Sequence, residues 1–105
     1  MLMGSDRLEA LMVEPRTEGD VGVEAVVLPP FRLVLHNDEV NTMDHVAESL
    51  VLCVPEVSVE AAWSIMLEAH DRGRAVVLVC PLERAELYAE RLGGRGITAS
   101  VEADG

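Results

Sequence analysis

The chain has 105 residues, which is enough for one domain and too short for two. Nineteen acidic side chains against eight arginines, with no lysine, give a formal net charge of −11. Nucleic acids and anionic membranes are bound through clusters of Lys and Arg, so this composition argues against both as partners and favours cationic ones.

A flexible extension is predicted over residues 1–29. Six acidic residues, three glycines and a proline interrupt it up to residue 28. Only Leu8, Leu11 and Met12 have the spacing of a helical turn, and a helix that short is marginal in water. The acidic residues also break the apolar stretch that a secretion signal needs, which predicts a cytoplasmic protein. A proline pair then marks the start of the predicted core, residues 30–105.

The first element of the core is predicted to be a strand over residues 31–36. Apolar side chains alternate there, starting with Phe31, so one face of the strand is expected to be buried. The residues that follow, up to Asn41, form a polar turn. Asn41 is placed to cap the next helix, with Asp44 three residues further on in the capping-box position.

Two helices are predicted next. In the first, which Pro55 ends, the apolar residues form a stripe with helical spacing: Met43, Val46, Ala47, Leu50 and Val51. The second follows its N-cap Ser58 and ends at Gly73, where a left-handed residue is favoured. Its core face is predicted to consist of Val59, Ala62, Trp63, Met66, Leu67 and His70.

A short apolar run over residues 75–80 is predicted to be the second strand, since it is too short for a helix. Pro81 suits the first position of a third helix, which ends near Gly93. Its core face is predicted to hold Ala85, Tyr88, Ala89 and Leu92. Alternation over residues 97–102 predicts the last strand. The order β-α-α-β-α-β indicates an α+β sandwich, a small three-stranded antiparallel sheet with three helices on one face.

Several residues can carry chemistry, and each also has a purely structural interpretation. The cluster over residues 37–39 is typical of turns. His70, at the end of a helix, is typical of a residue that stabilises the helix dipole. Met43 and Met66 lie on apolar stripes, where methionine usually fills the core. Taken singly, none of these features indicates a function.

The spacing of the histidines and cysteines gives little support for an enzymatic site. His36, His45 and His70, with Asp38, lack the HxH, HxxH or HExxH spacing of a metal site. Cys53 lies among apolar neighbours, where a thiol is normally inert, so it is not expected to act as a nucleophile with His70 as its base. The two cysteines form no CxxC motif. We therefore predict no catalytic residue, no metal and no cofactor.

Two separated motifs occur on the predicted elements. The first is an Asn-Asp-Asp/Glu turn followed by a methionine-led helix, which here reads Asn37-Asp38-Glu39 and Met43. The second is Met-Leu-x-x-His-x-x-Gly-Lys/Arg-Ala, which here spans residues 66–75. In this order the two motifs closely resemble the ClpS adaptor family. The resemblance covers residues 30–102, and the family has the same β-α-α-β-α-β sandwich.

The resemblance implies a recognition module. Members of the family bind proteins whose first residue is bulky and hydrophobic (Leu, Phe, Tyr or Trp), the N-degron, and deliver them to a ClpA or ClpC unfoldase that works with the ClpP protease. The residues that match the family's amine-binding site are Asn37, Asp38 and His70. Those that match its hydrophobic pocket are Met43, Val46, Met66, Ala69, Asn41 and Thr98. The branched aliphatic residue that is common at position 69 is alanine here.

Docking to the unfoldase is implied at Glu83, and Tyr88 stands where the family has a basic residue. A monomer is expected. Another interpretation remains open, a non-catalytic scaffold domain of the same topology without an N-degron pocket. In that case Asn37, Asp38 and His70 are turn and cap residues that share no ligand.

Overall fold

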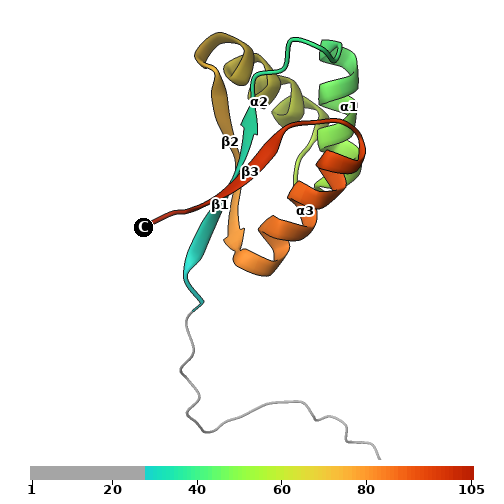
Figure 1. Cartoon of the computed structure of the whole chain (residues 1–105). Coiled ribbons are helices and arrows are strands. Elements are labelled where there is room, and N and C mark those ends of the chain that lie inside the picture. The colour runs from blue at the N-terminus through green and yellow to red at the C-terminus, as the bar shows by residue number, and fades with distance from the viewer. Residues whose placement is uncertain (1–27) are drawn as a thin grey trace, which may run out of the picture.

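The structure, a computed structural model, describes residues 28–105 (Figure 1). Its elements follow the predicted order: β1 (Pro30–His36), α1 (Met43–Cys53), α2 (Val59–Arg72), β2 (Arg74–Pro81), α3 (Leu82–Gly94) and β3 (Ala99–Ala103). Apart from its last two residues, the predicted extension over residues 1–29 lies outside the described residues, and so does the helical turn at Leu8, Leu11 and Met12. None of the described helices is long and apolar enough to cross a membrane.

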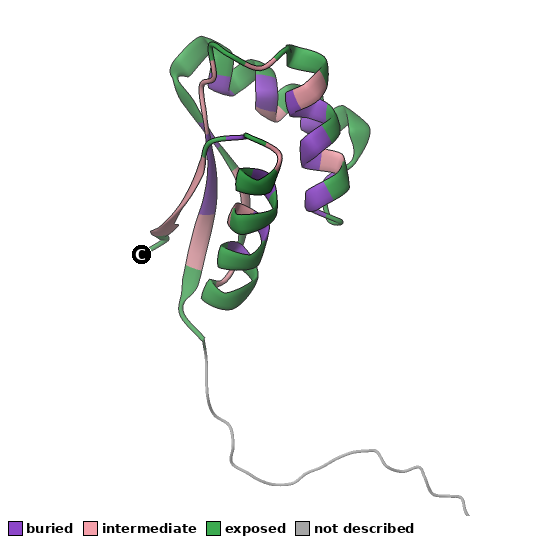
Figure 2. Ribbon diagram, turned by 45° about the vertical axis from the view of Figure 1, so that its right-hand side comes forward, coloured by how far each residue is buried: buried purple, intermediate pink, exposed green. Residues whose placement is uncertain are grey.

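The three strands form one antiparallel sheet in the order β2-β1-β3. β1 is therefore the central strand, with a partner along each edge. All three helices lie on one side of the sheet, and their buried residues form the core with the strands (Figure 2). The predicted α+β sandwich with three helices on one face is confirmed.

The burial of β1 differs from the prediction of a single buried face. Leu33 and Leu35 belong to the core beneath the helices, as expected. Val34 alternates with them and points to the other side of the sheet, yet it is also fully buried. Its partners are Val76 on β2 and Ser100 on β3, so neighbours on both edges shield the central strand from solvent.

The helix starts differ from the prediction at two places. Pro81 is the N-cap of α3 and not its first residue. α1 is capped by Thr42 and not by Asn41, because the Thr42 hydroxyl accepts a hydrogen bond of 3.1 Å from the backbone N–H of His45. The Asn41 side chain bonds to neighbouring loops instead. α2 has the predicted N-cap Ser58 and ends at the predicted left-handed glycine, Gly73, with φ 92°.

The predicted core face of α2 was right for Ala62 and Met66, which are buried together with Ala69. It was wrong for the other four residues, which are exposed: Val59, Trp63, Leu67 and His70. Alanine at two of the buried positions lets the helix approach the sheet closely, and close packing decides which face turns inward. The bulky apolar residues are left on the surface.

Candidate functional site

A pocket lies where the end of β1 meets the start of α1 and the end of α2. It is lined by these three elements and by the loop between β1 and α1: Leu35, His36, Asn37, Asp38, Asn41, Met43, Val46, Met66, Ala69 and His70. Its cavity volume is about 30 Å³. Most of the polar side chains come from the loop, whereas the helices contribute mainly methionine and aliphatic groups. The pocket therefore has a polar rim and an apolar wall.

The rim is organised by Asp38, whose carboxylate closes the turn after β1. Its Oδ1 accepts hydrogen bonds from the backbone N–H groups of Val40, at 2.7 Å, and Asn41, at 3.1 Å. Its Oδ2 accepts another from the side-chain Nδ2 of Asn41. These bonds, that from the Asn41 side chain foremost, hold the pKa of Asp38 below its usual value. The carboxylate is thus ionised in neutral solution and fixes the shape of the loop.

Asn37 and Glu39 form a second polar pair on the same loop. The Nδ2 of Asn37 donates to Oε2 of Glu39 at 2.8 Å. Since the amide nitrogen is engaged, the side-chain oxygen of Asn37 remains an acceptor. The backbone N–H of Asn37 donates to the carbonyl of Gly73 at 2.9 Å, which ties the loop to the end of α2. The sequence motif identifies Glu39 only as a turn residue. Its hydrogen bond with Asn37 places a second carboxylate beside the rim.

Asn41 connects the rim to the distant loop between α3 and β3. Its Nδ2 also donates to the carbonyl of Gly96, at 2.8 Å. That loop is held against α1 by Arg95, whose Nε donates to the hydroxyl of the buried Ser49 at 2.7 Å. The carbonyl of Arg95 lies 2.8 Å from Nε2 of His45. The rim carboxylate is therefore positioned by residues far outside its own turn.

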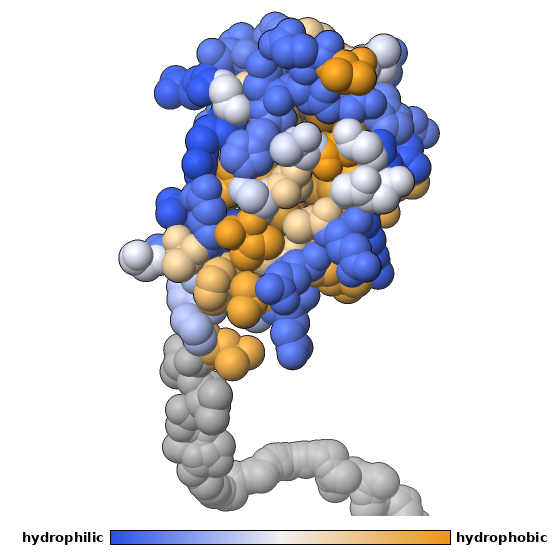
Figure 3. Space-filling view, viewed as in Figure 1, coloured by the Kyte–Doolittle hydropathy of each residue, from blue (hydrophilic) through white to orange (hydrophobic). Residues whose placement is uncertain are grey.

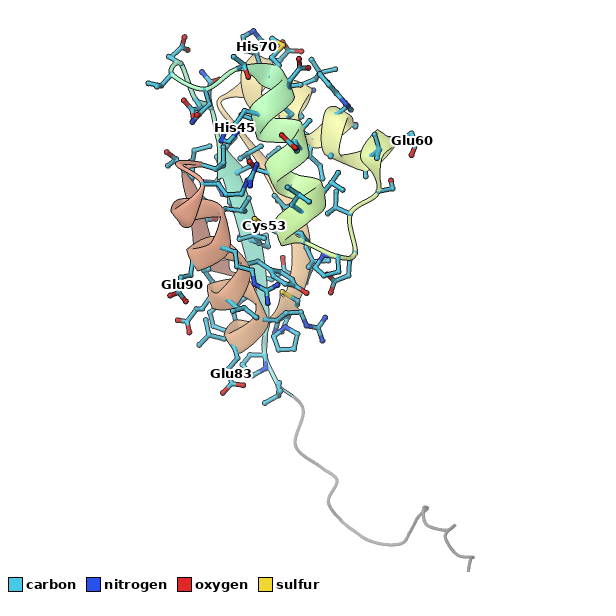
Figure 4. The ribbon with its side chains drawn as sticks, turned by 90° about the vertical axis from the view of Figure 1, so that its right-hand side faces the viewer. His45, Cys53, Glu60, His70, Glu83 and Glu90 are labelled. Carbon is cyan, nitrogen blue, oxygen red and sulfur yellow. The ribbon has the colours of Figure 1, made fainter. Side chains whose placement is uncertain are left out.

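On the helical side of the pocket, one side chain is free to move and two are held in the core. Met43 is 43% exposed, whereas Met66 and Ala69 are buried. Methionine is unbranched and adopts many rotamers, so Met43 can move aside for a ligand at little energetic cost. His70 is exposed near the end of α2 and lies at the same end of the molecule as the loop (Figure 4).

The structure brings together eight of the nine residues that the family resemblance assigns to amine binding and to the pocket. Thr98 is the ninth and does not line the pocket. It is exposed, and its backbone carbonyl accepts a hydrogen bond of 3.0 Å from the N–H of His36. Glu83, assigned to docking, is exposed at the start of α3. Tyr88 is buried, so its side chain offers little surface to a partner.

The chemistry of the pocket is that of a binding site. Within residues 28–105, no group of three His, Cys, Asp or Glu side chains is arranged to hold a metal ion. Cys53 is buried in the core. The rim presents carboxylate, amide and imidazole acceptors next to an apolar wall. Such an arrangement suits a cation with several N–H donors that is attached to an apolar group.

Comparison with known protein families matches residues 28–98 to the family described as ClpS, ATP-dependent Clp protease adaptor protein ClpS. The Clp protease adapter protein ClpS of Prochlorococcus marinus (strain MIT 9515) is 46% identical over 76 residues, 72% of either chain. That of Synechococcus elongatus is 35% identical over 94 residues, 90% of this chain and 99% of the relative. The chloroplastic adapter CLPS1 of Arabidopsis thaliana is 37% identical over 107 residues, 97% of this chain and 67% of the relative.

A solved structure has a similar fold. It is that of Agrobacterium tumefaciens ClpS2 bound to L-phenylalaninamide, and it superposes with a TM-score of 0.65. The two sequences are 26% identical, and the match covers 72% of this chain and 98% of the other.

Proposed function

Because the chain belongs to the ClpS family of Clp protease adaptors, we propose that its pocket binds the free amine and the bulky hydrophobic first residue of substrate proteins. It then delivers them, as a monomer in the cytoplasm, to a ClpA- or ClpC-type unfoldase for degradation by ClpP. In this role it is an adaptor and not an enzyme. One observation supports the proposal most, the convergence of amide, carboxylate and imidazole groups on a single apolar pocket.

The polar rim accounts for recognition of an amine. A protonated α-amine presents three N–H donors in a tetrahedral arrangement. The side-chain oxygen of Asn37, the carboxylate of Asp38 and a ring nitrogen of His70 supply acceptors for them. Asp38 already accepts three hydrogen bonds, so it contributes mainly its charge, and Glu39 adds a second negative charge nearby. An acetylated amine lacks the positive charge and leaves acceptors without donors, which gives selectivity.

The apolar wall accounts for recognition of the first side chain. A cavity of about 30 Å³ admits a water-sized group, whereas a benzene-sized ligand fits a cavity of about 150 Å³. A Leu or Phe side chain therefore enters only when Met43 moves outward, which its exposure permits. The related ClpS2 of known structure binds L-phenylalaninamide, a free amine with a phenyl group.

Unfoldase docking is proposed at the other end of the molecule. Glu83 is in the first turn of α3 and lies at the end of the molecule opposite to His70 (Figure 4). Beside it is an apolar cleft of about 400 Å³, lined by Leu28, Pro29, Phe31, Pro81, Leu82 and Glu83. Apolar surface is visible close to where the described chain begins (Figure 3). We propose that the buried Tyr88 contributes to docking indirectly, by stabilising α3 from the core. An adaptor of this kind holds its substrate and its unfoldase at separate places.

The direct test is a titration of the full chain with a fluorescent peptide that begins with Leu, and with an N-acetylated copy of it. We expect saturable binding of the free amine alone. His70→Ala should remove this binding, whereas Glu90→Gln, at an exposed position on α3, should leave it unchanged (Figure 4). A scaffold domain binds neither peptide, and that result, or equal binding of both, contradicts the proposal. Delivery is tested by degradation of a Leu-initiated reporter with ClpA–ClpP and with ClpC–ClpP.

A further inference from the structure

A second and larger groove runs between α1 and α2 on the surface. Its cavity volume is about 280 Å³. The residues that line it are Asp44, Ala47, Glu48, Val51 and Leu52 from α1, with Val59 and Trp63 from α2. None of these residues lines the pocket proposed to bind the degron. The groove is therefore a separate feature of the surface.

The groove exposes several large apolar side chains. Leu52 is 60% exposed, Val59 57% and Trp63 37%. Leu67, one turn beyond Trp63, is exposed as well and extends the apolar stripe along α2. An exposed apolar surface that includes a tryptophan is typical of a protein interface. Ala47, small and buried, forms a low floor on the α1 side.

The charged side chains that line the groove are acidic. Among the described residues these are Asp44 and Glu48, with no Lys or Arg in the lining. Glu48 lies 3.8 Å from Arg95, which is outside the lining, and this ion pair leaves the Glu48 side chain 65% exposed. Positive charge at the edge of an occupant therefore favours binding, because it offsets the cost of covering these carboxylates.

Neither a second copy of this chain nor its own first 28 residues would bring net positive charge to the groove. A second copy seated groove against groove about a two-fold axis would place Asp44 and Glu48 near their own counterparts, and any other contact would still join two molecules of net charge −11. The first 28 residues contain six acidic residues against two arginines. Like charges that face each other across an interface are destabilising. The occupant is therefore a different protein.

We propose that the α1–α2 groove binds an amphipathic helix of a partner protein, with apolar residues at helical spacing and Lys or Arg along both edges. Two packed helices readily accept a third in the groove between them, and the apolar face of the incoming helix is then buried. Trp63 packs against that face, and the basic side chains lay their stems over Leu52 and Val59 while their charges reach Asp44 and Glu48. This surface acts independently of the degron pocket.

The test uses the full chain and two synthetic helical peptides of 18 residues, both N-acetylated so that neither can enter the amine site. One is built from Leu and Lys, and the other has Glu in place of every Lys. Trp63 is the only tryptophan of the chain, so its emission reports directly on the groove. We expect the Lys peptide to bind saturably with a blue shift of Trp63 emission, and at least about tenfold more tightly than the Glu peptide at moderate ionic strength.

Matched variants distinguish the groove from general attraction to an acidic protein. Leu52→Ser should weaken binding of the Lys peptide by about tenfold, and Glu48→Gln by about threefold. Their controls on α3, Leu87→Ser and Glu90→Gln, remove the same groups from exposed positions outside the groove and should change affinity by less than about twofold.

Three results would overturn the proposal. Equal binding of the two peptides, or equal effects of Leu52→Ser and Leu87→Ser, would mean that the groove does not select a basic helix. Sedimentation that shows a dimer of the free chain, lost in Leu52→Ser alone, would assign the groove to a second copy. A red shift of Trp63 emission without peptide, on replacing Leu8, Leu11 and Met12 by Ser, would assign it to the chain's own N-terminal residues.

Discussion

At the scale of single residues, Asp38 combines two tasks that sequence motifs cannot separate. Its carboxylate accepts three hydrogen bonds and thereby fixes the loop, and it also carries a charge at the rim of the pocket. Replacement by Asn keeps an oxygen for the backbone N–H groups of Val40 and Asn41 while it removes the charge. This substitution therefore removes the charge and keeps the two backbone bonds, while it loses the bond from the Asn41 side chain, because an amide NH2 then faces Nδ2 of Asn41.

We predict that Asp38→Asn weakens binding of a Leu-initiated peptide by about tenfold or more, since hydrogen bonds to charged groups are worth about 1.5–3 kcal/mol. Fluorescence anisotropy with the free-amine peptide measures the change, and Glu90→Gln serves as the control for loss of a carboxylate elsewhere. Wild-type affinity in Asp38→Asn, together with a loss in Glu39→Gln, would move the role of the carboxylate to Glu39.

Asp38 also predicts how the loop responds to acid. Its pKa is lowered, by the Asn41 side chain first and then by the backbone N–H groups of Val40 and Asn41, so the folded state favours the ionised form. Its stabilisation of the loop is complete above the ordinary carboxyl pKa of about 3.9 and is lost as the pH falls through the lower, folded value. We expect the amide signals of residues 40 and 41 to stay unchanged down to about pH 4 and to shift below it. Asp38→Asn should abolish that transition.

Ala69 predicts the choice of first residue. It is buried in the pocket wall, where the family commonly has a branched aliphatic residue, so the wall has less bulk here. We expect Phe and Trp to bind at least as well as Leu. Ala69→Val adds two methyl groups and should disfavour Phe and Trp relative to Leu by about 1–3 kcal/mol, the usual value of a methylene in such a pocket. Competition among peptides that differ only in residue one tests this, and an unaltered ranking would remove Ala69 from the pocket.

At the scale of elements, α3 is joined to the loop between α1 and α2 through a tyrosine. The hydroxyl of the buried Tyr88 donates to Oε1 of Glu56 at 2.8 Å, and Arg84 lies 3.2 Å from the other oxygen of Glu56. Burial raises the pKa of Tyr88, and its hydrogen bond to Glu56 raises it further. The contact thus depends on a neutral phenol.

We predict that Tyr88→Phe destabilises the fold by about 1 kcal/mol at neutral pH, the net contribution of a typical hydrogen bond. Because the folded pKa is the higher one, the stabilisation is complete below the ordinary tyrosine pKa of about 10 and disappears as the pH rises through the folded value. Urea unfolding between pH 7 and 11 should therefore show a steeper alkaline loss in the wild type than in Tyr88→Phe. Parallel curves would mean that the phenol is not coupled to folding.

The buried faces of the helices were predictable from apolar periodicity in two helices and not in the third. The periodicity of α1 and α3 identified their buried sides, because polar residues bound the apolar stripe on both edges. In α2 the apolar arc is wider than the helix can bury, and hydropathy favours Trp63 over Ala62. Close packing reverses that order, since the small side chain allows the helix to approach the sheet. The apolar surplus left outside forms the groove between α1 and α2.

At the scale of the whole molecule, the order of elements and most of the pocket were predictable, whereas the long-range supports of the pocket were not. The residues of the rim are close in sequence to β1 or belong to one helix turn of α2. The bond from Asn41 to the carbonyl of Gly96 joins residues 55 positions apart, and no local pattern encodes it. Thr98 was assigned to the pocket by resemblance alone, and here its side chain lies outside the lining.

The division of the chain predicts a separation of binding from delivery. The described residues that line the pocket all lie between positions 35 and 70. Residues 2–24 carry an excess of acidic side chains, and charges act on a bound peptide only weakly beyond about 8 Å at physiological ionic strength. We predict that deletion of residues 2–24 changes the affinity for a Leu-initiated peptide by less than about twofold at that ionic strength.

The same deletion should abolish degradation of the Leu-initiated reporter, because the family resemblance gives this segment a part in hand-over to the unfoldase. Anisotropy and a degradation assay on the same preparation measure both effects. Unchanged degradation would show that residues 28–105 suffice for delivery, and a large loss of affinity would show that the segment takes part in the pocket.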